Sequence, residues 1–219
     1  MTALYNVVVK NRHVEGENIA VMEFESATST ALPKIEAGAH IDVHLPNGMV
    51  RQYSLCQNPN QTGIFRLGIL RDPESRGGSI SAFNELKDGM QIQVSEPKNL
   101  FSLVKAKHSV LIGGGIGITP LITMAYQLAH QGESFELHYC GASPERCAFV
   151  DEIKNGELAQ FTTFHFKSEG ASHRARAGSG RQANGCPEQD EGHHQEGSQA
   201  LRERRRDRQR ACHHRVGAD

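Results

Sequence analysis

The stretch Ser109-Val-Leu-Ile-Gly-Gly-Gly-Ile-Gly-Ile-Thr-Pro120 decides the fold of its half of the chain. Its short apolar run predicts a strand, and the glycine turn leads into a helix that Thr119 would cap and Pro120 would open. The helix is predicted to end at Gln131-Gly132. Glycines let a pyrophosphate approach the backbone, and a helix N-terminus offers free N–H groups to an anion. The same residues also suit a tight strand–helix turn that binds nothing, so this motif alone leaves both interpretations open.

The sequence after this helix continues to alternate between strand and helix patterns. Phe135, Leu137 and Tyr139 predict a second strand. A second helix is expected from Ser143-Pro144 to about Lys154, followed by a third strand over residues 161–166. Such alternation predicts a parallel sheet with right-handed crossovers.

The first hundred residues instead have the period of two that is typical of strands. Ile41, Val43 and Leu45 alternate with polar residues, and Pro46-Asn47-Gly48 supplies a hairpin turn. Similar short runs at residues 19–24, 49–55, 65–69 and 92–94 predict further strands. A short helix is expected from Ser79 to about Lys87. Many short strands separated by turns predict a small antiparallel barrel.

Two motifs within the predicted barrel are candidates for anion binding. Arg76-Gly-Gly-Ser79 combines a guanidinium, unhindered backbone N–H groups and a hydroxyl at a helix start. Arg51-Gln-Tyr-Ser-Leu55 places an Arg, an aromatic ring and a hydroxyl along one strand, where they would suit a flat anionic ligand. Taken singly, the first also fits a flexible turn and the second an ordinary strand.

Together, in this order and spacing, the three motifs resemble the ferredoxin–NADP reductase superfamily. The similarity is greatest to the branch of phthalate dioxygenase reductase and vanillate O-demethylase oxidoreductase, and it covers about residues 3–167. Supporting segments are Leu70-Arg-Asp72, Glu96-Pro-Lys-Asn-Leu-Phe101 and His138-Tyr-Cys-Gly141. The resemblance implies a Greek-key flavin-binding barrel over residues 1–103 and a partial NAD-binding α/β domain over 104–168. In this branch it also implies a C-terminal [2Fe–2S] domain.

The resemblance also implies roles for individual residues. The flavin site would consist of the phosphate-binding residues Arg51, Arg76, Gly77, Gly78 and Ser79, and of Tyr53, Ser54, Leu55, Leu70 and Arg71 around the ring system. Within this set Tyr53 would pack on the flavin, and Ser54 would lie close to flavin N5. The NADH pyrophosphate would face Gly113, Gly114, Gly115 and Gly117, with Thr119 where the flavin and the nicotinamide meet.

The cofactors expected from these motifs are FMN and NADH. A phosphate site formed by Arg-Gly-Gly-Ser would end the ligand at one phosphate, which favours FMN over FAD. For the nicotinamide nucleotide, Ala142 stands where an Arg would suggest a 2′-phosphate partner, and Glu145 would repel a phosphate although Arg146 would attract one. The expected function is therefore an NADH-dependent flavin oxidoreductase that supplies electrons to the terminal oxygenase of an aromatic-ring oxygenase or O-demethylase system.

Composition and charge exclude several other classes. With 24 basic and 25 acidic residues the formal net charge is −1, which argues against a nucleic-acid-binding protein. No apolar run approaches the ~20 residues of a membrane span, and the N-terminal residues lack the pattern of a signal peptide. The five cysteines show no C-x-x-C spacing, so neither a disulfide framework nor a cysteine-only zinc site is expected. We expect a cytoplasmic protein with reduced thiols.

The sequence changes character after about Glu169. Leu201 and Val216 are the only large aliphatic residues of this segment, so we expect residues 169–219 to be a disordered tail. It could be a native extension, a metal- or RNA-binding segment, or the translation of a shifted reading frame, and the abrupt loss of the family pattern favours the last. The plant-type Cys-x₄-Cys-x₂-Cys ligands of a [2Fe–2S] cluster are absent from the sequence. An alternative function is therefore a flavin-binding remnant that NADH reduces slowly or not at all.

Overall fold

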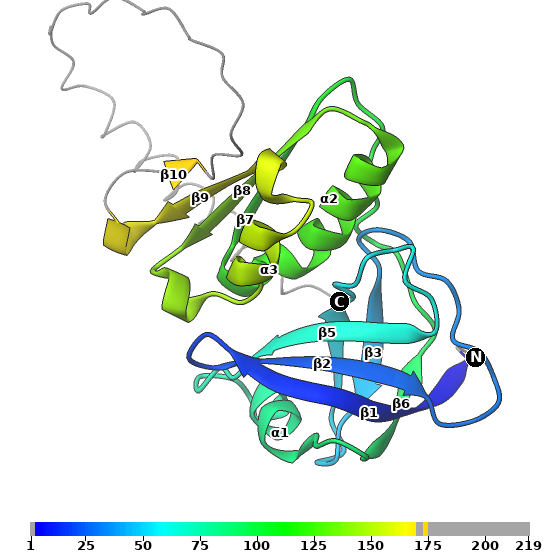
Figure 1. Ribbon diagram of the computed structural model, residues 1–219. Coiled ribbons are helices and arrows are strands. Elements are labelled where there is room, and N and C mark those ends of the chain that lie inside the picture. The colour runs from blue at the N-terminus through cyan, green and yellow to red at the C-terminus, as the bar shows by residue number, and fades with distance from the viewer. Residues whose placement is uncertain (1–2, 170–172, 175–219) are drawn as a thin grey trace, which may run out of the picture. The chain divides into compact units, whose positions relative to one another are not determined.

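The computed structural model describes residues 3–169 and 173–174, and within these residues the strands form two sheets (Figure 1). The strands of the first sheet are β1 (Leu4–Glu15), β2 (Ile19–Ser26), β3 (His40–His44), β4 (Val50–Ser54), β5 (Ile64–Leu70) and β6 (Gln91–Ser95). Those of the second are β7 (Ser109–Gly114), β8 (Phe135–Gly141), β9 (Thr162–Phe166) and β10 (His173–Arg174). The predicted fold class, an antiparallel flavin-type barrel followed by an α/β unit, is confirmed.

The first sheet is antiparallel and closes on itself. Its order is β4-β3-β6-β1-β2-β5, so β4 and β5 are the outer strands. They meet through a bridge between Leu55 and Leu67 and through the Cys56 amide, which donates to the Arg66 carbonyl at 2.9 Å. Closure satisfies backbone groups that an open edge would leave unpaired. We call this closed sheet, with its short helix, the barrel.

The long strand β1 is the main element that the sequence reasoning missed. It pairs with both β2 and β6 and so lies in the interior of the sheet order. Val7 and Val9 are fully buried, and a bulge follows Val9. Val7 and Val9 lie two residues apart on the buried face, and the β-branched run Val7-Val-Val9 is a signal that predicts such a strand.

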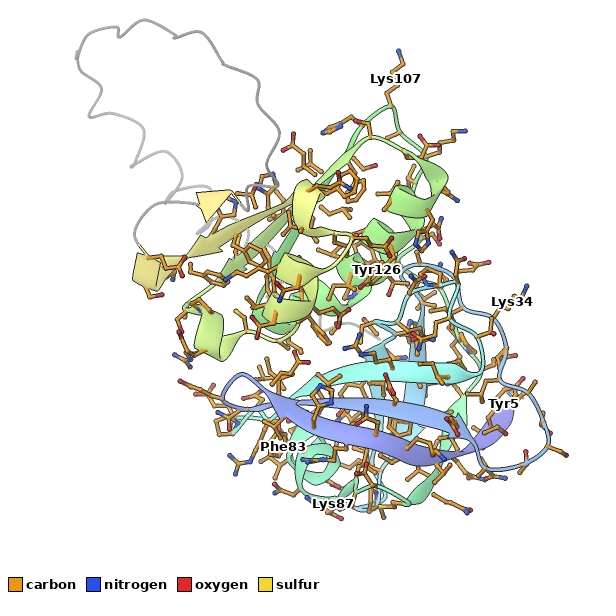
Figure 2. All side chains as sticks on the ribbon, viewed as in Figure 1. Tyr5, Lys34, Phe83, Lys87, Lys107 and Tyr126 are labelled. Carbon is orange, nitrogen blue, oxygen red and sulfur yellow. The ribbon has the colours of Figure 1, made fainter. Side chains whose placement is uncertain are left out.

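One helix, α1 (Gly78–Glu85), lies in the barrel between β5 and β6 and starts one residue before the predicted Ser79. Gly77 caps it with a positive φ of 94°. The Arg12 Nη2 of β1 donates to the Phe83 carbonyl at 2.8 Å, and the guanidinium carbon lies 5.3 Å from the centre of the Phe83 ring. These contacts hold the end of α1 on the barrel (Phe83 is labelled in Figure 2).

The second sheet is built largely as the alternation of patterns predicts. Strands β7, β8 and β9 are parallel, and α2 (Thr119–Gln131) and α3 (Val150–Asn155) connect them. Leu121, Met124, Ala125 and Leu128 of α2 are all buried in one cluster with the strands. We call residues 104–169 the α/β lobe.

The other face of this sheet has large exposed side chains. Val110 is 54% and Ile112 is 68% exposed, and β7 is an outer strand of the order β10-β9-β8-β7. In the part of the chain that the structure describes, no helix covers this face and no strand pairs with the outer edge of β7.

Thr119 is not the N-cap that the sequence predicts. It has helical dihedrals, with φ −54° and ψ −50°, because the short 3₁₀ helix η1 (Gly115–Ile118) already begins the turn. Its hydroxyl instead donates to the Ile116 carbonyl at 3.0 Å. No side chain therefore caps the N-terminus of α2 near the glycine turn.

The second helix predicted in the α/β lobe is divided in two. A 3₁₀ helix, η2 (Pro144–Arg146), is followed by three non-helical residues, the first of them extended, and α3 begins only at Val150. The break lies at Phe149, which has a left-handed φ of 62° and is 1% exposed. Its amide donates to the Glu15 carboxylate of the barrel. These tertiary contacts override the local helix pattern.

Most of the tail that the sequence predicts to be disordered lies outside the described residues. His173 and Arg174 form β10, which pairs antiparallel with β9 and was not predicted. Within the described part of the chain, no helix is both long and apolar enough to cross a membrane.

Candidate functional site

Arg51 and the Arg-Gly-Gly-Ser motif, which are far apart in sequence, lie in contact in the barrel. The Arg51 side chain crosses directly over Gly78, where a Cβ would lie 2.6 Å from the Arg51 Nε. Its guanidinium donates to the Val50 carbonyl at 2.8 Å and lies 3.3 Å from the Met49 sulfur. Glycine at this position makes room for the guanidinium, which lies beside the start of α1. The arrangement suits a phosphate, since charge, helix N-terminus and bare backbone coincide.

Ser79 and Arg76 complete the surroundings of this loop. The Ser79 hydroxyl lies 2.9 Å from the Ser75 hydroxyl and accepts from the Asp72 amide at 3.3 Å. Arg76 is exposed. The loop therefore presents two arginines and a hydroxyl at one helix start, and this local geometry fits an anionic group.

Strand β4 carries the residues that the resemblance assigns to the flavin ring. Tyr53 and Ser54 are half-buried, and Leu55, which follows them, is fully buried. Desolvation raises the pKa of Tyr53 above its ordinary value, so its hydroxyl stays protonated at neutral pH. Leu55 belongs to the barrel core, so Tyr53 and Ser54 are the residues of this set that present part of their surface to a ligand.

The end of β4 is joined to the α/β lobe by a buried hydrogen bond. Thr123 of α2 is 0% exposed, and its hydroxyl donates to the Leu55 carbonyl at 2.7 Å. This contact links the strand that carries the ring-side residues directly to the helix that follows the glycine turn. No sequence pattern distinguishes Thr123 from an ordinary helical residue, and the sequence reasoning did not find it.

A second link between barrel and α/β lobe is ionic. Arg66 Nη2 of β5 lies 2.7 Å from Glu152 Oε2 of α3, and the Tyr126 hydroxyl of α2 donates to the other carboxylate oxygen at 2.8 Å (Tyr126 is labelled in Figure 2). The Arg66 guanidinium also lies 5.0 Å from the centre of the Phe149 ring. Burial, chiefly, raises the pKa of Tyr126, and the neighbouring Glu152 charge adds to the shift.

The glycine turn lies at the carboxyl end of β7. Its positions differ in whether packing or backbone conformation requires a glycine. A Cβ on Gly113 would come within 2.9 Å of the Ile118 side chain, so packing requires glycine there. Gly115 has a positive φ of 51°. Gly114 and Gly117 have neither constraint, because a Cβ on either would meet nothing within 4 Å. Their bare, open backbone is therefore free for a ligand to approach.

A cavity of about 280 Å³ lies beside this turn and reaches the barrel. Its lining comes from residues 17–19, 115–116, 141–142 and 146–147 together with Leu70. The cavity thus lies at the carboxyl ends of β7 and β8, which is where ligands bind in open α/β sheets. Leu70 borders it from the barrel, and Gly115 borders it from the glycine turn.

Arg71 and Thr119 lie close to this junction. The Arg71 amide donates to the Asn18 carbonyl at 2.8 Å, which fixes the end of β5 against the β1–β2 turn. Thr119 is 6% exposed, and its methyl group would lie 3.1 Å from a Cβ on Gly68 of β5. The structure thus brings Thr119 of the α/β lobe against the barrel, and glycine at position 68 permits the contact.

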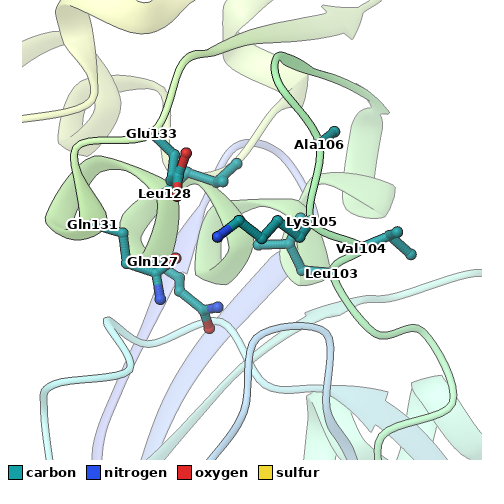
Figure 3. A pocket seen from close by; sticks show the side chains of 8 residues that line it. All are labelled: Leu103, Val104, Lys105, Ala106, Gln127, Leu128, Gln131 and Glu133. Carbon is teal, nitrogen blue, oxygen red and sulfur yellow. The ribbon is translucent and has the colours of Figure 1, made fainter.

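A separate hollow of about 320 Å³ lies between residues 103–106 and the C-terminal half of α2 (Figure 3). Gln127, Gln131, Glu133 and Lys105 contribute its polar side chains. None of the residues predicted for cofactor binding lines it, so we do not include it in the candidate site.

Three of the five cysteines lie within the described residues. Cys56 is fully buried, and desolvation raises its pKa to about 12. Cys140 and Cys147 are free thiols, and no cluster of three or more potential ligands is present within the described residues. Donors for a [2Fe–2S] cluster are thus missing from this part of the chain, and Cys186 and Cys212 lie outside it.

The barrel with its phosphate-type loop, followed by a parallel sheet with a glycine turn, defines the ferredoxin reductase-like class of fold. Residues 6–102 match the family model described as the oxidoreductase FAD-binding domain. The chain is 44% identical over 164 residues to vanillate O-demethylase oxidoreductase of Pseudomonas sp. (strain HR199), covering 74% of this chain and 52% of that protein. It is 41% identical over 145 residues to phthalate dioxygenase reductase of Burkholderia cepacia, covering 65% and 45%.

A solved structure of phthalate dioxygenase reductase superposes with a TM-score of 0.72 at 36% identity, covering 75% of this chain and 52% of that one. Residues 6–102 therefore belong to the oxidoreductase FAD-binding domain family, and the chain is homologous to vanillate O-demethylase oxidoreductase and phthalate dioxygenase reductase. It spans about half the length of the curated relatives it matches.

Proposed function

We propose that this chain carries the flavin- and NADH-binding part of a reductase that supplies electrons to the terminal oxygenase of an aromatic-ring oxygenase or O-demethylase system. The observation that carries the proposal is a pair of glycine-rich turns at helix starts: the Arg51 side chain lies over Gly78 at one of them, and the backbone of Gly114 and Gly117 is open at the other. The names of the relatives, a vanillate O-demethylase oxidoreductase and a phthalate dioxygenase reductase, support the choice of electron acceptor.

FMN is the flavin that the phosphate loop fits best. Arg51, Arg76 and the backbone at Gly77–Gly78 would hold a terminal phosphate, with the Ser79 hydroxyl as a further donor. Tyr53 would pack against the ring system, while Ser54 and Leu55 would line its edge. The loop offers one helix start and two arginines, which would suit a single terminal phosphate and so support FMN over FAD.

NADH would lie in the cavity at the carboxyl ends of β7 and β8. Backbone N–H groups at Gly113–Gly117 would receive its pyrophosphate, as the open space over Gly114 and Gly117 allows. Leu70, Arg71 and Thr119 would border the place where the nicotinamide meets the flavin. The bound cofactors would supply hydride and one-electron chemistry, and the residues of this chain would orient the two cofactors and exclude water.

The described residues provide no ligands for the [2Fe–2S] cluster that the branch implies, so we derive no step through it. A second candidate function is a flavin-binding protein without electron-transfer competence. Within the described residues, the face of β7 that no helix covers and its unpaired outer edge favour it, because parallel sheets are normally covered on both faces. Anaerobic mixing of the flavin-loaded chain with NADH separates the two: bleaching of the flavin supports the reductase, and a stable yellow complex supports the alternative.

Flavin titration tests the phosphate loop directly. We expect tighter binding of FMN than of FAD, and a double substitution Arg76→Ala and Ser79→Ala should weaken FMN binding. Each lost hydrogen bond to a charged group costs ~1.5–3 kcal/mol, or about 10- to 150-fold in affinity. Asn84→Ala on the exposed side of the same helix is the matched control. Equal affinity for FMN and FAD, or no loss in the double variant, would contradict the assignment.

A further inference from the structure

The turn between β1 and β2 packs closely against the α/β lobe. Gly16 has a positive φ of 57°, and a Cβ there would lie 3.2 Å from the Glu145 carbonyl oxygen and 3.3 Å from the Cys147 nitrogen. On one side of Gly16, the Glu15 carboxylate accepts from the Phe149 amide. On the other, the Asn18 carbonyl accepts from the Arg71 amide at 2.8 Å. The barrel therefore fixes this turn at the cavity beside the glycine turn.

Glu17 extends from this turn to the α/β lobe. Its Oε2 lies 3.3 Å from Arg146 Nε, and both residues line the cavity that also contains Gly115 and Gly141. Among the described residues that line this cavity, Arg146 is the only cation. Both side chains are largely exposed, at 62% for Arg146 and 57% for Glu17, so water and salt screen the pair.

Arg146 follows β8, the second parallel strand along the chain. In nucleotide-binding α/β sheets, the residues after this strand contact the adenosine ribose, where an acid suits a free 2′-hydroxyl and an arginine accommodates a 2′-phosphate. An unpaired Arg146 would therefore attract a 2′-phosphate. The Glu17 carboxylate neutralises that guanidinium and adds negative charge beside it.

We propose that Glu17, a barrel residue, sets the nucleotide preference of the α/β lobe by holding Arg146 in an ion pair that disfavours a 2′-phosphate. This inference rests on the proposed nucleotide site. It assigns a specificity-determining residue outside the sheet that binds the nucleotide, and it explains how an arginine can border the cavity of an NADH-binding site.

The experiment compares ADP with adenosine 2′,5′-bisphosphate by isothermal titration calorimetry of the full chain at low ionic strength. In Glu17→Gln, the affinity for the bisphosphate relative to ADP should rise about two- to fivefold, the range expected for an exposed ion pair. Adding Arg146→Gln to this variant should remove the gain. The rise should also diminish as salt is added.

Glu25→Gln is the matched control, because Glu25 forms a similar exposed pair with Lys10, at 3.6 Å, outside the cavity. Its affinity ratio should equal that of the unchanged chain. An unchanged affinity ratio in Glu17→Gln, or a gain that persists without Arg146, would overturn the inference. In that case, binding of ADP would still support the proposed nucleotide site. Failure of ADP to bind the unchanged chain would overturn the proposed nucleotide site together with the inference.

Discussion

At the scale of single residues, a substitution at Gly78 should affect the stability of the fold and the affinity for FMN differently. It lies at the first position of α1, where alanine is favoured over glycine by about 0.5–1 kcal/mol. A methyl group there would displace only the flexible Arg51 side chain, whose Nε would be 2.6 Å away. We therefore expect Gly78→Ala to keep or raise the melting temperature and to lower FMN affinity. Thermal unfolding and flavin titration of the same sample test this, and loss of stability with unchanged FMN affinity would contradict it.

Cys56 provides a second test at this scale. Its thiol is fully buried, and desolvation raises its pKa to about 12. Because the thiolate is the reactive form, the folded chain should leave Cys56 unmodified by iodoacetamide at pH 8. Addition of urea should expose it and restore an ordinary pKa. Peptide mapping by mass spectrometry measures this, with the partly exposed Cys140 as the internal comparison. Rapid labelling of Cys56 in the native state would show that its burial is wrong.

At the scale of elements, helix α2 holds the barrel and the α/β lobe together through Thr123. Thr123→Val keeps the shape but leaves the Leu55 carbonyl without its buried donor at 2.7 Å. An unsatisfied buried group costs about 1–3 kcal/mol, so the free energy of unfolding should fall by that amount. Thr123→Ser is the control that retains the hydroxyl. Urea unfolding curves compare them, and a Val variant as stable as the Ser variant would argue against the bond.

The helices and strands also show which parts of the fold can be predicted from the sequence. The alternation at Ile41, Val43 and Leu45 and the apolar face of α2 predict their elements well, because a local period is enough. The sequence did not reveal the break at Phe149 or the helical place of Thr119. Both depend on contacts with distant groups: Phe149 donates to Glu15 of the barrel, and Thr119 packs against Gly68.

The sequence likewise predicts some features of the candidate site and not others. The glycine turn and the Arg-Gly-Gly-Ser loop are local motifs, and their composition suffices to suggest anion binding. The contact between Arg51 and Gly78 joins segments whose spacing carries no such information, and only the family resemblance suggested it. Thr123 and Glu17 have no sequence signal, since their partners are a backbone carbonyl and a side chain from the other part of the fold. The cofactor roles of all these residues stay predictions.

At the scale of the whole chain, the coding DNA can test the origin of the segment after Glu169. If this segment is read from a shifted frame, a neighbouring frame should encode a Cys-Gly-Pro segment and then Cys-x₄-Cys-x₂-Cys. That spacing supplies thiolates for a plant-type cluster. Sequencing of the gene and translation in the other two frames is the test. Absence of this cysteine pattern from both frames would leave the segment as a native extension.

The last prediction concerns the outer edge of β7 and the face of this strand that no helix covers within the described residues. The strand carries no charge or proline that would block pairing, and Val110 and Ile112 are 54% and 68% exposed. We therefore expect the chain to self-associate increasingly as its concentration rises. Val110→Thr with Ile112→Thr should reduce this, because threonine keeps the strand preference while removing apolar surface.

Val50→Thr is the matched control, since Val50 is 44% exposed but lies on β4 of the closed barrel. Sedimentation velocity over a concentration series measures the association of all three chains. Reduced association in the β7 variant alone would locate the contact at this edge. If the control reduces association equally, or the β7 variant associates like the unchanged chain, the open edge is not the surface through which copies meet.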